Sequence, residues 1–177
     1  GIPGTVGGAL SMNAGAFGGE TWDNVESVEV VTRQGEVLTR QRDAYKVGYR
    51  QVVAPTTDEW FLAARFRFVP DADTDMSRVT ALIQERREKQ PLGLPSCGSV
   101  FGNPEGDYSA RLIEACGLKG FRIGGAEVSP KHANFIINTG TASAADLEAL
   151  ILHVQQVVDR EHGIFLQPEV RIVGEPL

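Results

Sequence analysis

Hydrophobic and polar residues alternate along the first third of the chain, and this pattern predicts antiparallel strands. Residues 24–40 show it on both sides of Gln34-Gly35, a pair typical of a tight turn. We therefore expect a hairpin at this position. The residues that we expect to face one another across it are Val28, Val30, Val37 and Thr39.

Residues 60–70 repeat the period of two and predict a half-buried strand that Pro70 ends. The expected buried face holds Ala64, Phe66 and Phe68, and the polar face holds Arg65 and Arg67. After a linker at residues 71–75, apolar residues recur at helical spacing from Met76 until Pro91 stops the run. We expect an amphipathic helix there, followed by a hinge.

The clearest helix lies at residues 143–163. Ser143 is in the N-cap position, Asp146 follows three residues later, and Gly163 ends the pattern. Its apolar stripe consists of Leu147, Leu150, Ile151, Val154, Val157 and Val158. A shorter helix is expected at residues 108–116.

Short strands are expected at residues 134–140 and 165–174. Strands therefore come first, and helices mixed with strands follow, with a break between residues 71 and 96. This order is typical of the α+β class. We expect two domains, residues 1–90 and residues 91–177.

The amino-acid composition limits the classes of molecule that this protein is expected to bind. The 177 residues carry a net charge of −6, and no run of basic residues is longer than Arg86-Arg87, which argues against a nucleic-acid partner. No apolar run approaches the roughly 20 residues of a membrane span, and the opening residues do not have the pattern of a signal peptide. We expect a reduced, cytoplasmic, soluble protein. The sequence does not exclude a disulfide between Cys97 and Cys116.

The opening GIPGTVGGAL is rich in glycine, the residue that lets backbone approach a ligand. It resembles a phosphate-cradling loop, but the Walker lysine and the G-x-G-x-x-G pattern are both absent. A tight turn with close backbone packing is an equal alternative. The histidines have no carboxylate at ligand spacing, so we expect no metal; they are His132, His153 and His162.

Three polar residues are framed by residues that fix the backbone: Arg50 in VGYR, Ser99 in CGSVFGNP and Glu169 in QPEVRIVG. Ser99 does not match the G-x-S-x-G elbow of hydrolases, because position 101 is Phe. A serine hydroxyl can instead give a proton when a carbanion or enolate forms beside it, and an arginine and a carboxylate can stabilise or polarise that intermediate. A turn-forming serine and two solvated or ion-paired charges are the alternative.

Five motifs, in this order and at these separations, resemble the UDP-N-acetylenolpyruvoylglucosamine reductase family, also called UDP-N-acetylmuramate dehydrogenase. They are GIPGTVGGALSMNAGAFGGE, GYR, GSVFGNP, FRIGGAEVSPKHANFIINTGTASAADLEAL and PEVRIVG, and together they span essentially the whole chain. The resemblance is to the shorter form of the family, which lacks an insertion with an extra tyrosine loop between Arg65 and Met76.

This resemblance implies the second lobe of a two-lobed FAD-binding domain, followed by a small α/β substrate-binding domain. It implies that FAD and NADPH are the cofactors. The implied reaction is the reduction of UDP-N-acetylglucosamine enolpyruvate to UDP-N-acetylmuramate, a step of peptidoglycan precursor synthesis. Hydride goes to the vinyl carbon and a proton completes the reduction.

The resemblance also assigns roles to residues. Ser99 is the proton donor, while Arg50 and Glu169 polarise the enolpyruvyl carboxylate and steady the enolate. The cofactor-binding residues are Gly4, Thr5, Val6, Gly7, Gly8, Asn13 and Gly15. Candidates for the sugar and the diphosphate are Asn103, Lys119 and Arg122, for which a turn amide and two solvated cations are the alternative.

Two departures accompany the resemblance. The family usually has a serine two residues after the arginine of GYR, where this chain has Val52. In the family, a first FAD-binding lobe precedes the residues that match the opening of this chain, so we expect 177 residues alone to be weakly active or inactive. The alternatives are another flavin oxidoreductase of the same cofactor-binding superfamily, or a non-catalytic UDP-sugar-binding remnant.

Overall fold

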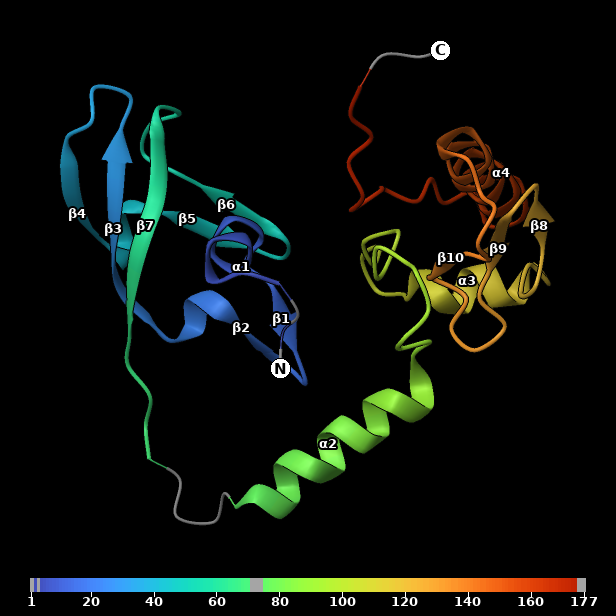
Figure 1. The fold of residues 1–177 in the computed structure, drawn as a ribbon, viewed down its shortest axis with the longest axis horizontal. Helices are drawn as coiled ribbons and strands as arrows, with labels where there is room; N and C mark the ends of the chain where they lie inside the picture. The colour runs from blue at the N-terminus through green and yellow to red at the C-terminus, as the bar shows by residue number, and fades with distance from the viewer. Residues whose placement is uncertain (1, 3, 71–74, 175–177) are drawn as a thin grey trace. The chain divides into compact units, whose positions relative to one another are not determined.

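The computed structural model describes residue 2, residues 4–70 and residues 75–174. It divides into two compact units, residues 1–82 and residues 83–177 (Figure 1). Most of the expected linker at residues 71–75 lies outside the described residues. The division falls inside a helix, and the expected domain boundary after residue 90 stays a prediction.

The first unit is built on an antiparallel sheet of order β4-β3-β7. Its strands are β3 (Val25–Thr32), β4 (Val37–Gln41) and β7 (Glu59–Phe66). Val28 and Val30 on β3 are buried with the expected period of two, and the bulge between Val25 and Ser27 shifts the pattern by one residue so that Val25 is buried as well. The buried core of this unit consists of Leu10, Trp22, Val25, Val28, Val30 and Tyr45.

The expected pairing across the first hairpin is wrong by one residue. Val30 lies opposite Leu38, and Val28 lies opposite Arg40. Turn bonds set this register: Thr32 N–H donates to Glu36 O at 2.8 Å, so the turn is longer than a two-residue turn at Gln34-Gly35. Leu38 therefore packs on the core, while Val37 is 61% exposed.

The glycine-rich opening contains a helix that its composition did not predict. Helix α1 (Val6–Met12) begins at Thr5, whose Oγ1 accepts a hydrogen bond from Gly8 N–H at 3.1 Å. It is held by Leu10, which is 1% exposed and whose carbonyl accepts the Trp22 Nε1–H at 2.7 Å. Burial of one side of the helix thus outweighs the low helix propensity of two glycines.

Short elements complete the first unit. They are β1 (Gly15–Ala16), β2 (Gly19–Glu20), β5 (Lys46–Gly48), β6 (Gln51–Val53) and the 3-10 turns η1 (Thr21–Asp23) and η2 (Arg42–Ala44). Two hairpins result, β1 with β2 and β5 with β6. Val52 on β6 packs against the core, which fits an apolar residue where the family usually has serine.

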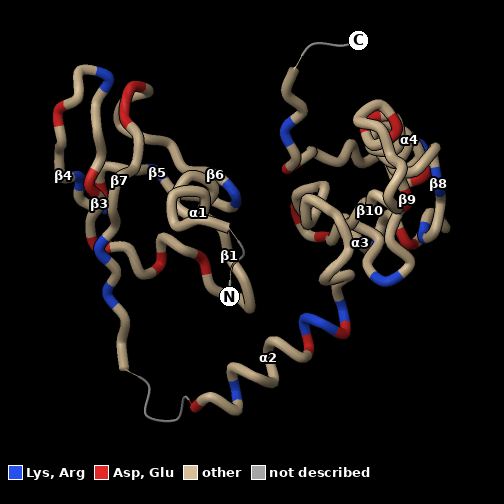
Figure 2. Tube along the Cα trace, viewed as in Figure 1, with Lys and Arg blue, Asp and Glu red and all other residues tan. Residues whose placement is uncertain are grey.

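Helix α2 (Met76–Lys89) matches the expected helix, and none of its residues is buried. Its second half carries charges of both signs (Figure 2), including a Lys89–Glu85 ion pair at 2.6 Å. Lys131 Nζ donates to the carbonyl of Arg87 at 2.5 Å, which ties the end of α2 to the second unit.

The second unit has the sheet β10-β9-β8 and two helices. Its elements are α3 (Ser109–Ala115), β8 (Arg122–Ile123), β9 (Ala126–Val128), β10 (Ile136–Asn138) and α4 (Ala144–His162). Helix α4 has the expected capping box of Ser143 and Asp146, and Gly163 ends it at φ 66°. The core of this unit includes Phe101, Leu112, Ile113, Val128, Leu150, Val154, Val158 and Leu166.

The strand expected at residues 165–174 is wrong as a continuous strand. This segment makes only a single bridge, between Phe101 and Pro168. Pro168 has no N–H to donate, and the N–H groups of Glu169 and Val170 both reach the carbonyl of Val100, at 2.8 and 3.5 Å. A regular ladder is therefore interrupted at this point. Cys97 and Cys116 are both free thiols.

Candidate functional site

The opening residues line a cavity of about 400 Å³ in the first unit. Gly4, Thr5 and Val6 form part of its wall, and Phe66 and Phe68 form another part, with their rings stacked at 6.0 Å. The wall is mostly apolar and is bordered by exposed glycine-rich backbone. Such a cavity suits a flat aromatic group with a polar extension, so these residues fit the FAD that the sequence implies.

Asn13 joins the glycine-rich opening to the hairpin that carries Arg50. Its side chain is 1% exposed, and Nδ2 donates to Glu20 Oε2 at 2.6 Å and to Gly48 O at 3.0 Å. Its Oδ1 accepts from Trp22 N–H at 3.1 Å. Both amide donors of Asn13 are used inside the protein, and its expected role toward the cofactor stays a prediction.

Glycine is required at position 15 because neighbouring atoms lie too close for a Cβ, and not because of its backbone torsion angles. A Cβ there would lie 2.7 Å from Gly19 O and 3.4 Å from Arg50 Nη1. The strands β1 and β2 can therefore approach each other this closely only with glycine at this position, and the Arg50 guanidinium lies beside the same hairpin.

Arg50 sits in the tight turn between β5 and β6 with a left-handed φ of 52°. Its guanidinium lies over the Tyr49 ring, 5.0 Å from the centroid, and Nη1 donates to Asn13 O at 3.4 Å. Few non-glycine residues adopt this backbone conformation, and such residues cluster at binding and catalytic sites. The turn holds a half-buried cation next to the glycine-rich opening.

Ser99 and Glu169 are brought together by the second unit. Ser99 bridges to Phe135 on one side of its segment, and Phe101 bridges to Pro168 on the other. Gly102 N–H donates to Gln167 O at 2.9 Å, and the Glu169 carboxylate lies 3.7 Å from the Cβ position of Gly102. Both site residues are half-buried.

Asn103 continues this segment toward α3. Its Oδ1 accepts from Ser109 N–H at 3.1 Å, and Ser109 Oγ donates to Gly102 O at 2.5 Å. Asn103 is exposed, so its amide can meet a ligand while it caps the start of the helix.

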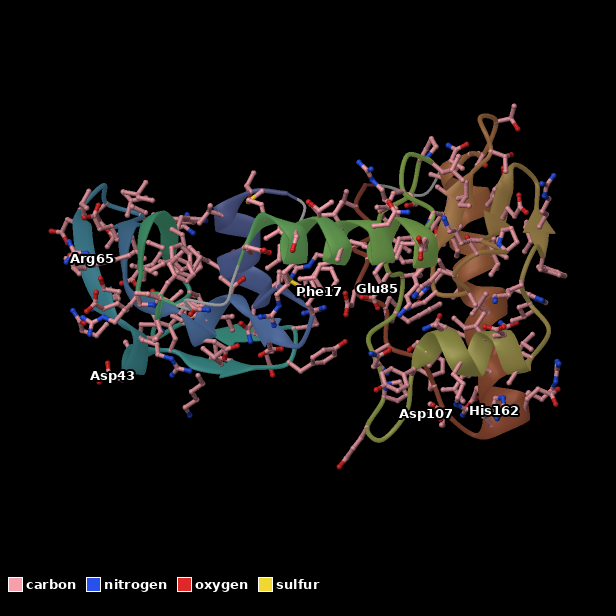
Figure 3. The ribbon with its side chains drawn as sticks, turned by 90° about the horizontal axis from the view of Figure 1, so that it is seen from below. Phe17, Asp43, Arg65, Glu85, Asp107 and His162 are labelled. Atoms are coloured by element: carbon pink, nitrogen blue, oxygen red, sulfur yellow. The ribbon has the colours of Figure 1, made fainter. Side chains whose placement is uncertain are left out.

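An ion pair between Arg111 and Asp107 joins α3 to the residues just before it. Arg111 hydrogen-bonds Asp107, and together with the Tyr108 N–H it lowers the pKa of the Asp107 carboxyl from 3.8 to about 2. His162 lies at the same end of the unit (Figure 3), and its electrostatic effect is the smallest contribution to the lowered pKa of Asp107.

A carboxyl whose pKa is lowered by folding stabilises the fold above its unfolded pKa and loses that effect as the pH falls. We therefore expect Asp107 to titrate at about pH 2 in the folded chain, measured by carboxyl ¹³C NMR. Its stabilising effect should be complete above about pH 4 and decline below it. Arg111→Ala should move the midpoint up toward 3.8, because it removes the largest cause. An unchanged midpoint in that variant would contradict this assignment.

Lys119 and Arg122 lie on the segment from α3 to β8, and each has an acidic partner. Lys119 pairs with Glu114 at 2.8 Å, and Arg122 pairs with Glu127 at 2.6 Å. Neither pair is deeply buried, so an anionic ligand can compete for the two cations. Their role toward a diphosphate stays a prediction.

Two features of the site were not anticipated from the sequence. One is the second face of the cavity, formed by Phe66 and Phe68. The other is Asn134, which is 4% exposed and hydrogen-bonded to both peptide groups of Phe101. No local pattern identifies this buried amide, since the run HANFII holds two polar residues, His132 and Asn134, and the hydrogen bonds of Asn134 to Phe101 cross 33 residues.

Within the described ranges, no three His, Cys, Asp or Glu side chains gather into a group that could hold a metal ion. None of the helices in that part of the chain is long and apolar enough to cross a bilayer.

Comparisons with known proteins agree across both units. Residues 1–40 match the FAD binding domain family, and residues 90–173 match the C-terminal domain of UDP-N-acetylenolpyruvoylglucosamine reductase. Proteins named UDP-N-acetylenolpyruvoylglucosamine reductase are similar to this chain. The one from Alkalilimnicola ehrlichii is 59% identical over 99% of the chain, and the one from Methylococcus capsulatus is 56% identical over 99%.

A solved structure is also similar: the crystal structure of UDP-N-acetylenolpyruvylglucosamine reductase from Thermus caldophilus. It has a TM-score of 0.79 and 34% identity, and the match covers 97% of this chain and 61% of that protein. The chain spans 59% of the Alkalilimnicola ehrlichii protein and 58% of the Methylococcus capsulatus protein. Over the residues that it contains, this chain belongs to the UDP-N-acetylenolpyruvoylglucosamine reductase family.

Proposed function

We propose that the protein reduces UDP-N-acetylglucosamine enolpyruvate to UDP-N-acetylmuramate with FAD and NADPH. The observation that carries this proposal is 59% identity to a named reductase over 99% of the chain, across both units. FAD, when bound, would pass the electrons of NADPH to the enolpyruvyl double bond. The residues of this chain would bind, orient and protonate the substrate.

The proposed proton donor is the Ser99 hydroxyl. Its segment is fixed on both sides by backbone bridges, so Oγ can be held at one position while charge develops on the substrate carbon. The proton leaves Oγ for the carbon that does not receive hydride. Glu169 lies in the neighbouring segment, and its carboxyl group is proposed to polarise the enolpyruvyl carboxylate from that side.

Arg50 is proposed to bind the enolpyruvyl carboxylate. Its guanidinium is a planar, permanently charged fork, and the Tyr49 ring and the Asn13 carbonyl restrict where it can point. Restriction before binding lowers the entropy lost when the carboxylate arrives. Gly4, Thr5 and Val6 line the cavity and are proposed to form one wall for FAD. The other residues of the glycine-rich opening proposed to approach the cofactor are Gly7, Gly8, Asn13 and Gly15.

Asn103, Lys119 and Arg122 are proposed to contact the sugar or the diphosphate. The two cations can exchange their carboxylate partners for phosphate oxygens. The two free cysteines suit a reducing compartment, which supports the proposed cytoplasmic location. The net charge of −6 supports a small-molecule substrate rather than nucleic acid.

A hybrid reductase tests this proposal. In this hybrid, the 177 residues replace the matching residues of the Alkalilimnicola ehrlichii protein, and that unaltered protein is the control. We expect the hybrid to bind FAD with a structured visible band and to oxidise NADPH only when the enolpyruvate is added. The 177-residue chain alone should bind FAD far more weakly, because affinity is built from many ordered contacts.

Other outcomes would support the alternatives. NADPH oxidation that depends on oxygen and ignores the enolpyruvate would identify a different flavin oxidoreductase. Binding of the UDP-sugar without any requirement for FAD would identify a non-catalytic module. Either result would overturn the proposed reductase.

A further inference from the structure

The segment that carries Ser99 is short and lies outside the regular strands. Residues 99–102 touch residues 134–135 on one side and residues 167–170 on the other, through single bridges and a few backbone bonds. Val100 N–H donates to Asn134 O at 2.8 Å, and Val100 O accepts from Glu169 N–H at 2.8 Å. So few bonds would leave the segment free to shift unless something further fixes it.

The Asn134 side chain supplies that further restraint. Its Oδ1 accepts from Phe101 N–H at 3.0 Å, and its Nδ2 donates to Phe101 O at 2.7 Å. The carboxamide therefore pairs with both peptide groups of one residue, as the backbone of a neighbouring strand would. Only 4% of Asn134 is exposed, so water does not compete for these bonds.

The turn that presents Asn134 is itself hydrogen-bonded. Ser129 Oγ accepts from Lys131 N–H at 3.1 Å and from His132 N–H at 3.2 Å. The Asn134 N–H donates to His132 Nδ1 at 3.3 Å. These hydrogen bonds fix the turn at residues 129–134, and therefore they also fix the position of the Asn134 carboxamide.

Phe101 connects the Asn134 carboxamide to the site residues Ser99 and Glu169. Its side chain is 2% exposed in the core, and its peptide groups lie between Ser99 and Gly102. Gly102 is the residue against which the Glu169 carboxylate lies. Fixing Phe101 therefore sets where Ser99 and Glu169 stand relative to each other.

We propose that Asn134 is a positioning residue, whose buried carboxamide holds the Ser99 segment in register for proton donation. This inference rests on the proposed function. Asn134 does not act on the substrate; it acts through Phe101. Misplacement of a reacting group by about 1 Å can lower a rate by roughly 100-fold.

The experiment compares Asn134→Ala and Asn134→Asp in the hybrid reductase, with Asn138→Ala as the matched control. Asn138 also bonds local backbone, with Oδ1 accepting from Gly140 N–H at 2.8 Å, but it holds the loop before α4. We expect both Asn134 variants to be reduced by NADPH at the normal rate. Their reoxidation by the enolpyruvate should be about 10- to 100-fold slower.

The aspartate variant separates positioning from unfolding. It keeps the shape and the acceptor for Phe101 N–H, but a carboxylate cannot donate to Phe101 O. A protonated carboxyl can donate, so the reoxidation rate of Asn134→Asp should recover as the pH is lowered. The control and the unaltered hybrid should not show this recovery.

Amide hydrogen exchange in the 177-residue chain gives a readout that needs no cofactor. We expect the Phe101 amide to lose protection in Asn134→Ala and to keep most of it in Asn134→Asp, which retains the acceptor, while amides of α4 keep theirs in both variants. Normal reoxidation in a folded Asn134→Asp variant, or an unchanged Phe101 amide in Asn134→Ala, would overturn the positioning role alone. An unaltered hybrid that never reduces the enolpyruvate would overturn the proposed function, and this inference with it.

Discussion

Gly125→Ala is expected to destabilise the second unit by about 3 kcal/mol, the upper end of the range for overpacked cores. A Cβ at this position would overlap the backbone of Thr141 and Ala142, with Ala142 Cα only 2.7 Å away. Backbone atoms cannot rotate out of the way as the end of a side chain can. The same glycine accepts from Thr139 N–H at 3.0 Å and donates to Asp146 Oδ2 at 3.3 Å, so a shift would strain both bonds.

The chain offers separate probes for its two units. Both tryptophans, Trp22 and Trp60, lie in the first unit, while α4 belongs to the second. Urea unfolding followed by circular dichroism at 222 nm should show the loss in Gly125→Ala, and tryptophan fluorescence should keep its transition. Gly102→Ala is the matched control, because the nearest atom to its Cβ is at an ordinary 3.7 Å. Equal midpoints for the two variants would contradict the prediction.

The regular elements of the fold were predictable where one local signal was strong. Helix α4 has a capping box, an apolar stripe and a terminal glycine that agree with one another, and it forms where they predict. The hairpin register, helix α1 and the strand expected at residues 165–174 were not predicted correctly, because contacts distant in sequence decide them. The hairpin register depends on the turn bonded between Thr32 and Glu36, and α1 forms because Leu10 is buried against Trp22.

The site was predictable only in part. The resemblance of the motifs to a known family picks out Ser99 and Glu169, but sequence alone does not place residues 70 apart on adjoining segments. In the structure, the bridge between Phe101 and Pro168 holds these two segments next to each other. Asn134 was not identified from the sequence, because its role comes from two hydrogen bonds to a residue 33 positions away, which no local pattern encodes.

Ser99→Ala in the hybrid reductase should show the second large effect. We expect NADPH to bleach bound FAD at the normal rate, because that half-reaction needs no proton from Ser99. Reoxidation by the enolpyruvate should fall by about 100-fold or more, the usual range for loss of a positioned proton donor. Stopped-flow absorbance of the flavin band measures both half-reactions on one sample.

Ser96→Ala is the matched control, since it removes the same hydroxyl three residues earlier from an exposed position. Ser99→Cys adds a sharper comparison. A thiol is a stronger acid than an alcohol and can still give up a proton, so this variant should recover part of the reoxidation rate that alanine loses. If alanine and cysteine are equally slow, Ser99 acts through its size or its hydrogen bonds rather than as an acid. If both reoxidise at the normal rate, the proton comes from another group, and Ser99 is only a turn residue of its segment.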